Sequence, residues 1–304
     1  MSAFYSIIIP HYNIPQLLKR CLESIPRRDD VQVIVVDDCS RDDVRTELKG
    51  LQALFPTFHF VYSVKNDGGG AARNIGLQQA TGDYVLFADA DDFFHDCIND
   101  VFDDYQDETC DIVYFNADSV DSETYCVRSR ADRLQGQIED SLRGTDKDFL
   151  GLRYQFTEPW CKMIRRSLIE RFQIRFDETP SVNDATFSYM VGYHAKTIKV
   201  DRRKAYCIVH RKDSITFTKS LVWERMKLEV MARKNRFMID HGIPVFDTGM
   251  FYPFSESYHR KDWKSLDEYF GIARDNGFSK SYILFKLVLR SLKYRILNAI
   301  NLKR

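Results

Sequence analysis

Cysteine is scarce in this 304-residue sequence and is not arranged for metal or disulfide bonding. The seven cysteines are odd in number, scattered along the chain and never spaced as a CxxC pair. This pattern argues against a zinc site and a disulfide framework and is typical of the reducing cytosol, so we expect a cytoplasmic protein. They are Cys21, Cys39, Cys97, Cys110, Cys126, Cys161 and Cys207.

Long apolar runs and a net charge are also missing. No apolar run reaches about 18 residues, so we predict no transmembrane helix. The chain begins with a strand pattern and shows no basic region or cleavage site, so no leader peptide is expected. The formal charge is zero because 44 Lys and Arg residues balance 44 Asp and Glu residues. A global attraction to nucleic acid or acidic membranes is therefore excluded.

Two familiar phosphate-binding motifs are absent as well. No GxGxxG fingerprint follows the first apolar run, which disfavours a Rossmann dehydrogenase. The glycine-rich stretch at 68–70 is not followed by the GK[ST] of a Walker A loop.

What the sequence does contain is a regular alternation of strand and helix patterns over residues 1–115. This order predicts an α/β fold with a doubly wound, mostly parallel, Rossmann-like sheet and right-handed crossovers. In such sheets ligands bind at the carboxyl ends of the strands. Apolar runs predict strands over 4–9, 31–36, 57–63, 84–88 and 112–115.

The strand predicted at 84–88 ends in a carboxylate cluster. Asp89 and Asp91 alternate, so in an extended chain they point to the same side. Two carboxylates in this position form a hard-oxygen site for Mg²⁺ or Mn²⁺, which often brings a phosphate with it. The alternative is a solvated acidic turn in which Asp92 caps the following helix.

Three further polar groups fall at the same predicted edge. Tyr12 follows the first strand, Asp37 and Asp38 follow the second, and glycines 68–70 open a helix whose N-terminus favours anions. The alternative for the glycines is a flexible loop. Four polar clusters on one edge favour a ligand site there.

Beyond residue 115 the patterns are weaker. Residues 116–144 are polar and predict a hairpin or loop. We expect a domain over 1–217 and a C-terminal helical extension over 218–304. Helices are expected over 187–194, 222–239, 263–273 and 283–300, and strands over 197–200 and 205–210.

Taken in order, these motifs resemble those of family 2 glycosyltransferases over residues 4–217. The resemblance implies a GT-A fold that binds a nucleotide-diphosphate sugar through residues 1–115 and faces the acceptor with 116–217. It also implies Mn²⁺ or Mg²⁺ at a DxD motif, Asp89-Ala90-Asp91. The matching stretches are 7–13, 35–40, 70–76, 80–84, 88–92, 176–178, 183–184 and 211–216.

The resemblance also assigns roles to individual residues. Asp91 would be the direct metal ligand, Asp89 would hold ribose or metal-bound water, and Asp37 or Asp38 would accept a hydrogen bond from the base, most often uracil. His210 would complete the metal site or be a structural histidine. Residues implied to contact the donor are Pro10, Tyr12, Asn13, Asp37, Asp38, Gly69, Gly70, Arg73, Asp89 and Ala90.

The resemblance makes Asp184 the general base of an inverting transfer. A carboxylate opposite the leaving group can take the proton of an attacking hydroxyl, which contributes about 10²- to 10⁴-fold. A single displacement without an enzyme nucleophile inverts the anomeric carbon. The alternative for Asp184 is a plain helix N-cap.

The sequence departs from the family at two places. Asn183-Asp184 stands where many relatives have Glu-Asp, and His11 replaces a small or β-branched residue. We expect His11 to be either a solvent-facing loop residue or a ligand contact.

The implied function is an inverting hexosyltransferase of surface polysaccharide synthesis, such as capsule or lipopolysaccharide. A UDP-sugar is the expected donor, and a saccharide or polyprenyl-diphosphate-linked saccharide is the expected acceptor. The alternatives are transfer to a polyprenyl phosphate and binding of nucleotide sugar without turnover. No Asp or Glu follows Asp275. The helix over 280–304 is expected either to contact the cytosolic face of a membrane peripherally or to pack on the domain.

Overall fold

The computed structural model describes residues 4–211 and 220–289, which belong to two compact units. The first unit covers residues 1–217 and the second covers 218–304. The predicted motif beyond Arg211 and the predicted tail beyond residue 289 lie outside the described residues.

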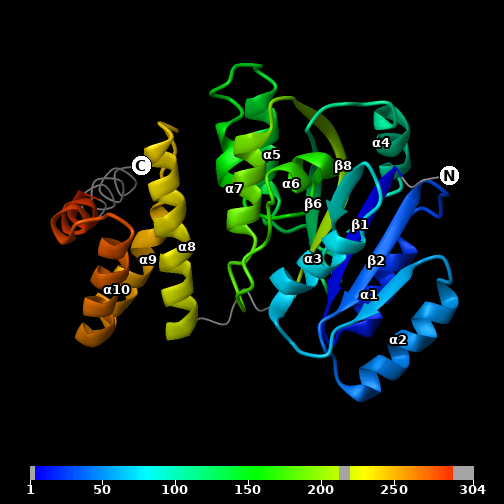
Figure 1. The fold of residues 1–304 in the computed structure, drawn as a ribbon, viewed down its shortest axis with the longest axis horizontal. Coiled ribbons are helices and arrows are strands. Elements are labelled where there is room, and N and C mark those ends of the chain that lie inside the picture. The colour runs from blue at the N-terminus through cyan, green and yellow to red at the C-terminus, as the bar shows by residue number, and fades with distance from the viewer. Residues whose placement is uncertain (1–3, 212–219, 290–304) are drawn as a thin grey trace. The chain divides into compact units, whose positions relative to one another are not determined.

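The first unit is built on one eight-stranded sheet in the order β3-β2-β1-β4-β7-β6-β8-β5 (Figure 1). Parallel pairing joins β1 to β2 and β4, β2 to β3, and β6 to β8. The predicted α/β class with a mostly parallel, GT-A-like sheet is therefore confirmed. The strands are β1 Tyr5–His11, β2 Val31–Asp37, β3 His59–Tyr62, β4 Tyr84–Phe87, β5 Phe93–Phe94, β6 Ile112–Asp121, β7 Lys162–Arg165 and β8 Ile198–His210.

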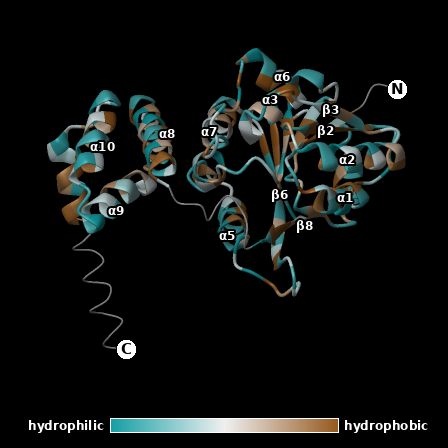
Figure 2. Cartoon of the chain, turned by 90° about the horizontal axis from the view of Figure 1, so that it is seen from below, coloured by the Kyte–Doolittle hydropathy of each residue, from teal (hydrophilic) through white to brown (hydrophobic). Residues whose placement is uncertain are grey.

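Helices cover the sheet and leave its central strands without solvent contact. Ile8 of β1, Val35 of β2 and Phe87 of β4 are almost completely buried, as expected for parallel strands covered on both faces. In Figure 2 the strands in the middle of this unit are largely hydrophobic. The helices are α1 Pro15–Glu23, α2 Asp42–Leu54, α3 Gly68–Gln79, α4 Ile98–Tyr105, α5 Asp132–Ser141, α6 Arg166–Arg171 and α7 Ala185–His194, with a π-helical turn at Gly151–Gln155.

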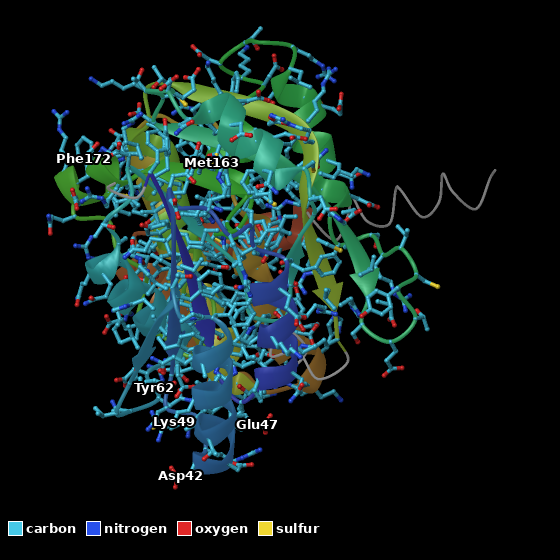
Figure 3. All side chains as sticks on the ribbon, turned by 90° about the vertical axis from the view of Figure 1, so that its right-hand side faces the viewer. Asp42, Glu47, Lys49, Tyr62, Met163 and Phe172 are labelled. Atoms are coloured by element: carbon cyan, nitrogen blue, oxygen red, sulfur yellow. The ribbon has the colours of Figure 1, made fainter. Side chains whose placement is uncertain are left out.

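Helix α2 shows how an amphipathic pattern attaches a helix to the sheet. Val44 and Leu48, one helical turn apart, are buried in the core. Glu47 and Lys49 are exposed and lie at the periphery (Figure 3). The helical spacing of Val44 and Leu48 thus puts both residues on the face that packs against the sheet.

The weaker part of the sequence folds differently from expectation. The predicted hairpin or loop at 116–144 is wrong: β6 continues to Asp121 and α5 follows. The two strands predicted at 197–200 and 205–210 are one strand, β8, because a register irregularity near Asn116 lets β6 follow it along its length. β7 runs antiparallel between β4 and β6.

The second unit consists of helices held by a buried ionic contact. Glu224 of α8 accepts bonds from both terminal nitrogens of Arg260 at 2.7 Å and from Tyr269 Oη at 3.0 Å. One carboxylate thus joins three helices, and the predicted helical extension is confirmed. They are α8 Leu221–Asp240, α9 Tyr252–Arg260 and α10 Trp263–Asp275, with a 3₁₀ turn at Thr248–Phe251; residues 280–289 are also helical.

Within the described ranges, no helix is long and apolar enough to cross a membrane.

Candidate active site

The carboxyl ends of β1, β2 and β4 meet the N-terminus of α3 along one edge of the sheet. β1 lies between β2 and β4 in parallel register, so these three strands end side by side. The predicted site residues of the first 92 positions therefore come together as expected from the doubly wound topology.

Three carboxylates gather directly after β4. One oxygen each from Asp89, Asp91 and Asp92 lies within 4.8 Å of the others. In the described part of the chain this group does not include His210, so the sequence-based suggestion that His210 completes the metal site gains no support. Asp92 is its third member. The alternative expectation that Asp92 caps the following helix is wrong, because α4 begins at Ile98 after Cys97.

Asp92 points into the protein and supports the other two. Its carboxylate accepts bonds from Tyr206 Oη at 2.9 Å and from the Val209 amide at 2.7 Å. Tyr206 Oη in turn accepts a bond from the Asp89 amide at 2.9 Å. Burial, followed by the charges of Asp91 and Asp89, raises the pKa of Asp92 well above its usual value. Asp92 is thus a scaffold that fixes the turn carrying the DxD pair.

Each acid of the DxD pair is matched by an arginine. Arg73 Nη2 donates to Asp89 Oδ1 at 2.6 Å, and Arg211 Nε donates to Asp91 Oδ2 at 2.7 Å. Burial and the neighbouring Asp89 raise the pKa of Asp91, and Arg211 opposes this shift. Ala90, between them, is buried.

The donor atoms of this group fit a hard divalent cation. All three are carboxylate oxygens, the ligand type preferred by Mg²⁺ and Mn²⁺. Because Asp92 is engaged by Tyr206 and Val209, the oxygens left for a cation are those of Asp89 and Asp91.

Asp184 lies at the start of α7 without capping it. Among the described residues, its carboxylate makes no bond to the first amides of that helix, so the alternative role as a plain N-cap is wrong. Burial first, then the charge of Glu158, raises the pKa of Asp184 to about 6, while Arg73 acts in the opposite direction. A carboxylate with this pKa ionises near neutral pH and remains a usable base.

Arg73 connects the DxD pair to the segment that carries Asp184. Its Nη1 donates to Asn183 Oδ1 at 3.3 Å while its Nη2 holds Asp89, and its guanidinium lies over the Phe176 ring at 5.5 Å. Its Nε is buried and has no hydrogen-bond partner in the described part of the chain. Arg73 thus bridges the two predicted motifs, with Asn183 in contact where many relatives have an acid.

Glu158 is a site residue that the sequence analysis missed. Its Oε2 is buried and lacks a hydrogen-bond partner within the residues described, and its charge acts on Asp184. The buried Lys162 fixes this segment through Nζ bonds to the Phe156 and Glu158 carbonyls at 2.9 and 2.6 Å. Lys162 also donates to Ser188 Oγ of α7 at 3.1 Å. The residues around Glu158 are thus tied to the helix that begins after Asp184.

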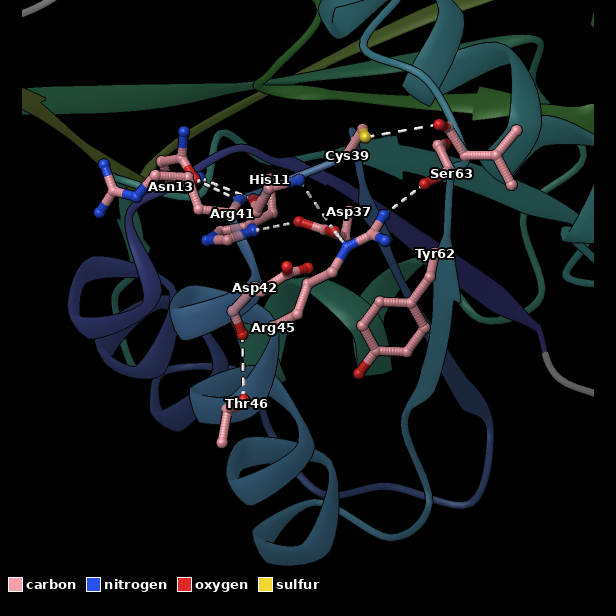
Figure 4. A network of polar contacts seen from close by, with 12 residues as sticks. His11, Asn13, Asp37, Cys39, Arg41, Asp42, Arg45, Thr46, Tyr62 and Ser63 are labelled. Carbon is pink, nitrogen blue, oxygen red and sulfur yellow. Dashed lines mark hydrogen bonds and ion pairs between the residues drawn. The ribbon is translucent and has the colours of Figure 1, made fainter.

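His11 and Asp37 form a buried structural pair rather than a ligand contact (Figure 4). His11 Nδ1 lies 3.1 Å from Asp37 Oδ1, and the Ile14 amide donates to His11 Nε2 at 3.1 Å. Since Nε2 accepts a bond, Nδ1 carries the proton and donates to Asp37. The expected solvent-facing His11 is wrong, because the residue is buried.

Asp37 is occupied on both oxygens. The Ser40 amide and Arg45 Nε donate to its Oδ2 at 3.2 and 3.0 Å. Burial acts to raise the pKa of Asp37, but the bonds from His11, Ser40 and Arg45 outweigh it and lower the pKa. Asp37 therefore ties β2 to β1 and α2.

Of Asp37 and Asp38, Asp38 is the better candidate for accepting a hydrogen bond from the nucleotide base. Its oxygens accept the amides of Asp67 and Gly68 at 3.1 and 2.8 Å, and it lines a pocket of about 310 Å³ with Tyr62 and Lys65. Burial raises its pKa, and the two amides oppose this shift.

The remaining predicted donor residues lie on the loop after β1 and at the start of α3. Tyr12 is exposed, Pro10 is paired with Val36 inside the sheet, and the Asn13 amide donates to Ser40 Oγ at 2.9 Å. Gly69 lies next to the Arg73 guanidinium, which is 3.3 Å from where its Cβ would be.

Gly70 is required by packing. A Cβ there would stand 2.1 Å from the Asp177 carbonyl oxygen and 2.9 Å from Asn183 Cβ. The glycine lets the first turn of α3 lie directly against the loop that leads to Asp184.

Comparison with known proteins agrees with this architecture. The glycosyl transferase family 2 model matches residues 6–172, more than half of the chain. TarS of Staphylococcus aureus, a poly(ribitol-phosphate) beta-N-acetylglucosaminyltransferase, is 24% identical over 284 residues, which cover 90% of this chain and 46% of TarS. The glycosyltransferase GlyG of Streptococcus pneumoniae is 24% identical over 81% of this chain and 84% of its own.

Solved structures share the fold. TarS 1–349 in complex with UDP-GlcNAc superposes with a TM-score of 0.65 at 18% identity over 90% of this chain and 81% of that chain. The Pyrobaculum calidifontis mannosyltransferase PcManGT, in complex with GDP-Man and Mn²⁺, gives 0.54 at 17% identity over 98% and 84%.

The chain spans about half the length of the first curated relatives it matches, 46% of TarS and 59% of EpsH from Bacillus subtilis. The family match itself extends from β1 through α6 and includes the DxD turn. The chain belongs to glycosyl transferase family 2.

Proposed function

We propose that the chain is an inverting glycosyltransferase that moves a sugar from a nucleotide-diphosphate donor to a hydroxyl of a saccharide or lipid-linked saccharide. The observation that carries the proposal is the position of Asp184. Its carboxylate is free of a capping bond, has its pKa raised to about 6, and is joined through Asn183 and Arg73 to Asp89.

In the proposed reaction Asp184 accepts the proton of the attacking acceptor hydroxyl. The acceptor oxygen forms a bond to the anomeric carbon as the bond from that carbon to the diphosphate oxygen breaks. The electron pair of the broken bond leaves with the nucleoside diphosphate. One displacement of this kind inverts the anomeric carbon.

The chain's own residues prepare the charges around this step. Arg73 holds Asp89 in place, and its guanidinium is next to Gly69 at the positive N-terminus of α3, where an anionic diphosphate is favoured. A divalent cation held by Asp89 and Asp91 would supply further stabilisation of negative charge on the leaving diphosphate.

Glu158 is proposed to act on Asp184 through its charge. Its Oε2 is buried and lacks a hydrogen-bond partner within the residues described, and its negative charge contributes to the raised pKa of Asp184. It supplies a carboxylate near the base in a chain that has Asn183 where many relatives have an acid.

A UDP-sugar is the proposed donor and surface polysaccharide synthesis the proposed setting. The name of TarS describes transfer of N-acetylglucosamine to poly(ribitol-phosphate), and its structure was obtained with UDP-GlcNAc. A related Campylobacter jejuni enzyme is named for glucosyl transfer to an undecaprenol-linked glycan. These names motivate UDP-GlcNAc and UDP-glucose as the first donors to test, with peripheral action at the cytosolic face of a membrane.

The proposal is tested by Mn²⁺-dependent hydrolysis of a panel of UDP- and GDP-sugars by wild type and Asp91→Ala. We expect one donor to be cleaved slowly by the wild type, using water as acceptor, and at least tenfold more slowly by the variant. Equal cleavage by both proteins would refute the metal site. Metal-dependent UDP binding without cleavage of any sugar, even with saccharide or polyprenyl-phosphate acceptors, would instead support a binding protein without turnover.

A further inference from the structure

A second cluster of metal-ligating side chains lies apart from the DxD pair. His95, Asp118 and Cys207 each offer one ligand atom, and the three atoms lie within 4.8 Å of one another. The three residues are far apart in sequence, so no spacing motif marks them. The expectation that this chain has no zinc site rested on such spacing.

The sheet itself brings these residues together. Asp118 of β6 and Cys207 of β8 are direct partners in parallel register, and Phe93 of β5 is the partner of Cys207 on its other side. Paired residues in a sheet point to the same face. His95 follows Phe93 by two positions, and its amide donates to the Ala205 carbonyl at 3.1 Å, which continues the β5–β8 pairing. All three ligand residues therefore lie on one face of three adjacent strands.

The contacts within the cluster leave one side open. His95 Nε2 lies 2.9 Å from Asp118 Oδ1, and Cys207 Sγ lies within 4.8 Å of the ligand atoms of both residues. Cys207 is fully buried, whereas the His95 and Asp118 side chains are 36% and 33% exposed. The sulfur thus forms the floor of the cluster, and solvent reaches the side opposite to it.

We propose that His95, Asp118 and Cys207 form a Zn²⁺ site with a solvent molecule as its fourth ligand. Thiolate sulfur, imidazole nitrogen and carboxylate oxygen are the usual protein ligands of zinc, and three such ligands with one open position form a known tetrahedral arrangement. The softer sulfur and nitrogen donors distinguish this cluster from the all-oxygen DxD group, which suits Mg²⁺ or Mn²⁺.

Zinc binding at this site releases protons. A coordinating thiol loses its proton to the metal's charge, and the imidazole–carboxylate hydrogen bond is replaced by two metal–ligand bonds. Affinity for zinc therefore increases with pH.

A zinc ion at this site would link the segment after the DxD turn to two strands of the sheet. His95 lies three residues after Asp92, and its two cluster partners lie on the long strands β6 and β8. Zinc held here would fasten the segment that follows the DxD turn to the sheet, while Asp89 and Asp91 remain available for a different cation.

Titration of EDTA-treated full-length protein with Co²⁺, a spectroscopic substitute for Zn²⁺, tests the site directly. We expect one equivalent to give a thiolate-to-cobalt charge-transfer band, which Zn²⁺ then displaces. The band should be lost in Cys207→Ser and the affinity reduced at least tenfold in His95→Ala. Cys97→Ser, which changes another cysteine, and Asp91→Asn, which changes the DxD group, should retain it.

His95→Ala is the decisive variant if Cys207→Ser fails to fold, because His95 is partly exposed. Zn²⁺ should raise the melting temperature of the wild type and leave that of His95→Ala unchanged. Absence of a thiolate band in the wild type, or a band of full strength in Cys207→Ser, would overturn the site. Neither result bears on donor binding, since no substrate is used.

Discussion

At the scale of single residues, the central feature is Asp184, the proposed general base, whose position disfavours local stability. Asp is a favourable N-cap residue, yet Asp184 occupies that position in α7 without making a capping bond. Its charged form is disfavoured by burial and by Glu158. Such costs are common where a group is held for catalysis.

The first prediction concerns Asp184 itself. Asp184→Asn keeps the shape of the side chain but removes the base, so kcat for sugar transfer should fall by about 10²- to 10⁴-fold. The affinity for UDP, measured by calorimetry, should stay within about threefold of the wild-type value, because Asp184 is not among the residues proposed to contact the nucleotide. The control is Asp132→Asn, an exposed acid at the start of α5. Transfer at wild-type rate by Asp184→Asn would remove Asp184 from the mechanism.

The second prediction concerns pH. Because the pKa of Asp184 is about 6, its base form is lost as pH falls through 6, and kcat/KM should fall with it. Glu158→Gln removes the negative charge that contributes to this shift, so the acidic limb should move to lower pH. The exposed Glu139→Gln is the matched control. A limb that stays in place in Glu158→Gln would show that Glu158 does not act on the base.

The sequence was sufficient for some residues of the site and insufficient for others. Asp89, Asp91, Arg73 and Asp184 stood in ordered motifs, and the structure brings them to one edge. Glu158 carried no local signal, because its significance depends on Lys162 and α7 fixing its segment. The burial of His11 could not be inferred, because its partner Asp37 comes within reach only when β1 and β2 pair.

At the scale of elements, α3 and the loop before α7 are packed and hydrogen-bonded to each other. Gly70 lets α3 approach the loop, and Asn74 makes three bonds to it. Its Nδ2 donates to the Phe176 carbonyl at 3.0 Å and to Glu178 Oε1 at 3.1 Å, and its Oδ1 accepts the Phe176 amide at 2.9 Å. Gly68–Gly70, the first residues of α3, and the loop that leads to Asp184 are therefore held together.

The third prediction tests this coupling. In Gly70→Ala the new Cβ meets the Asp177 carbonyl at 2.1 Å, so the loop must shift, at a cost of about 1–3 kcal/mol in the free energy of unfolding. Chemical denaturation measures that cost, and kcat should fall together with it. Gly136→Ala is the control: its Cβ meets nothing within 4 Å, and alanine should stabilise α5 by about 0.5–1 kcal/mol. Equal stability of the two variants would contradict the close approach.

Element prediction succeeded where the hydrophobic period was regular and failed where tertiary pairing decides the structure. The parallel strands β1, β2 and β4 are continuous apolar runs and were predicted. The two-residue β5 exists because β8 pairs with it, and α5 is largely polar, with Leu134 and Ile138 as its only buried apolar residues. Neither could be inferred from local periodicity.

At the scale of the whole molecule, the formal net charge is zero, so any attraction to a membrane must come from a local surface. The helix at 280–289 buries Ile283, and Lys280 and Lys286 lie over the rings of Phe270 and Phe246. The helix therefore packs on its own unit. It also exposes an apolar face that consists of Leu284, Phe285, Val288 and Leu289.

The fourth prediction is that this face contacts anionic membranes. In the full chain, Phe285→Glu combined with Leu289→Glu should reduce sedimentation with phosphatidylglycerol-containing vesicles at least tenfold. The two substitutions remove apolar side chains from the face and add negative charges that the anionic lipid headgroups repel. Leu54→Glu, an equally exposed leucine on α2, should leave sedimentation unchanged. Failure of the wild type to sediment with the vesicles would rule out the membrane contact.

The proposed function requires a metal-dependent donor site at the DxD turn, and calorimetry of UDP binding tests this site most directly. In the presence of Mn²⁺ the wild type should bind UDP, EDTA should abolish the heat, and Asp91→Ala should weaken binding at least tenfold. Asp43→Ala, an exposed acid on α2, should bind as the wild type does. UDP binding that is indifferent to both metal and Asp91, or no binding at all, would contradict the proposed donor site.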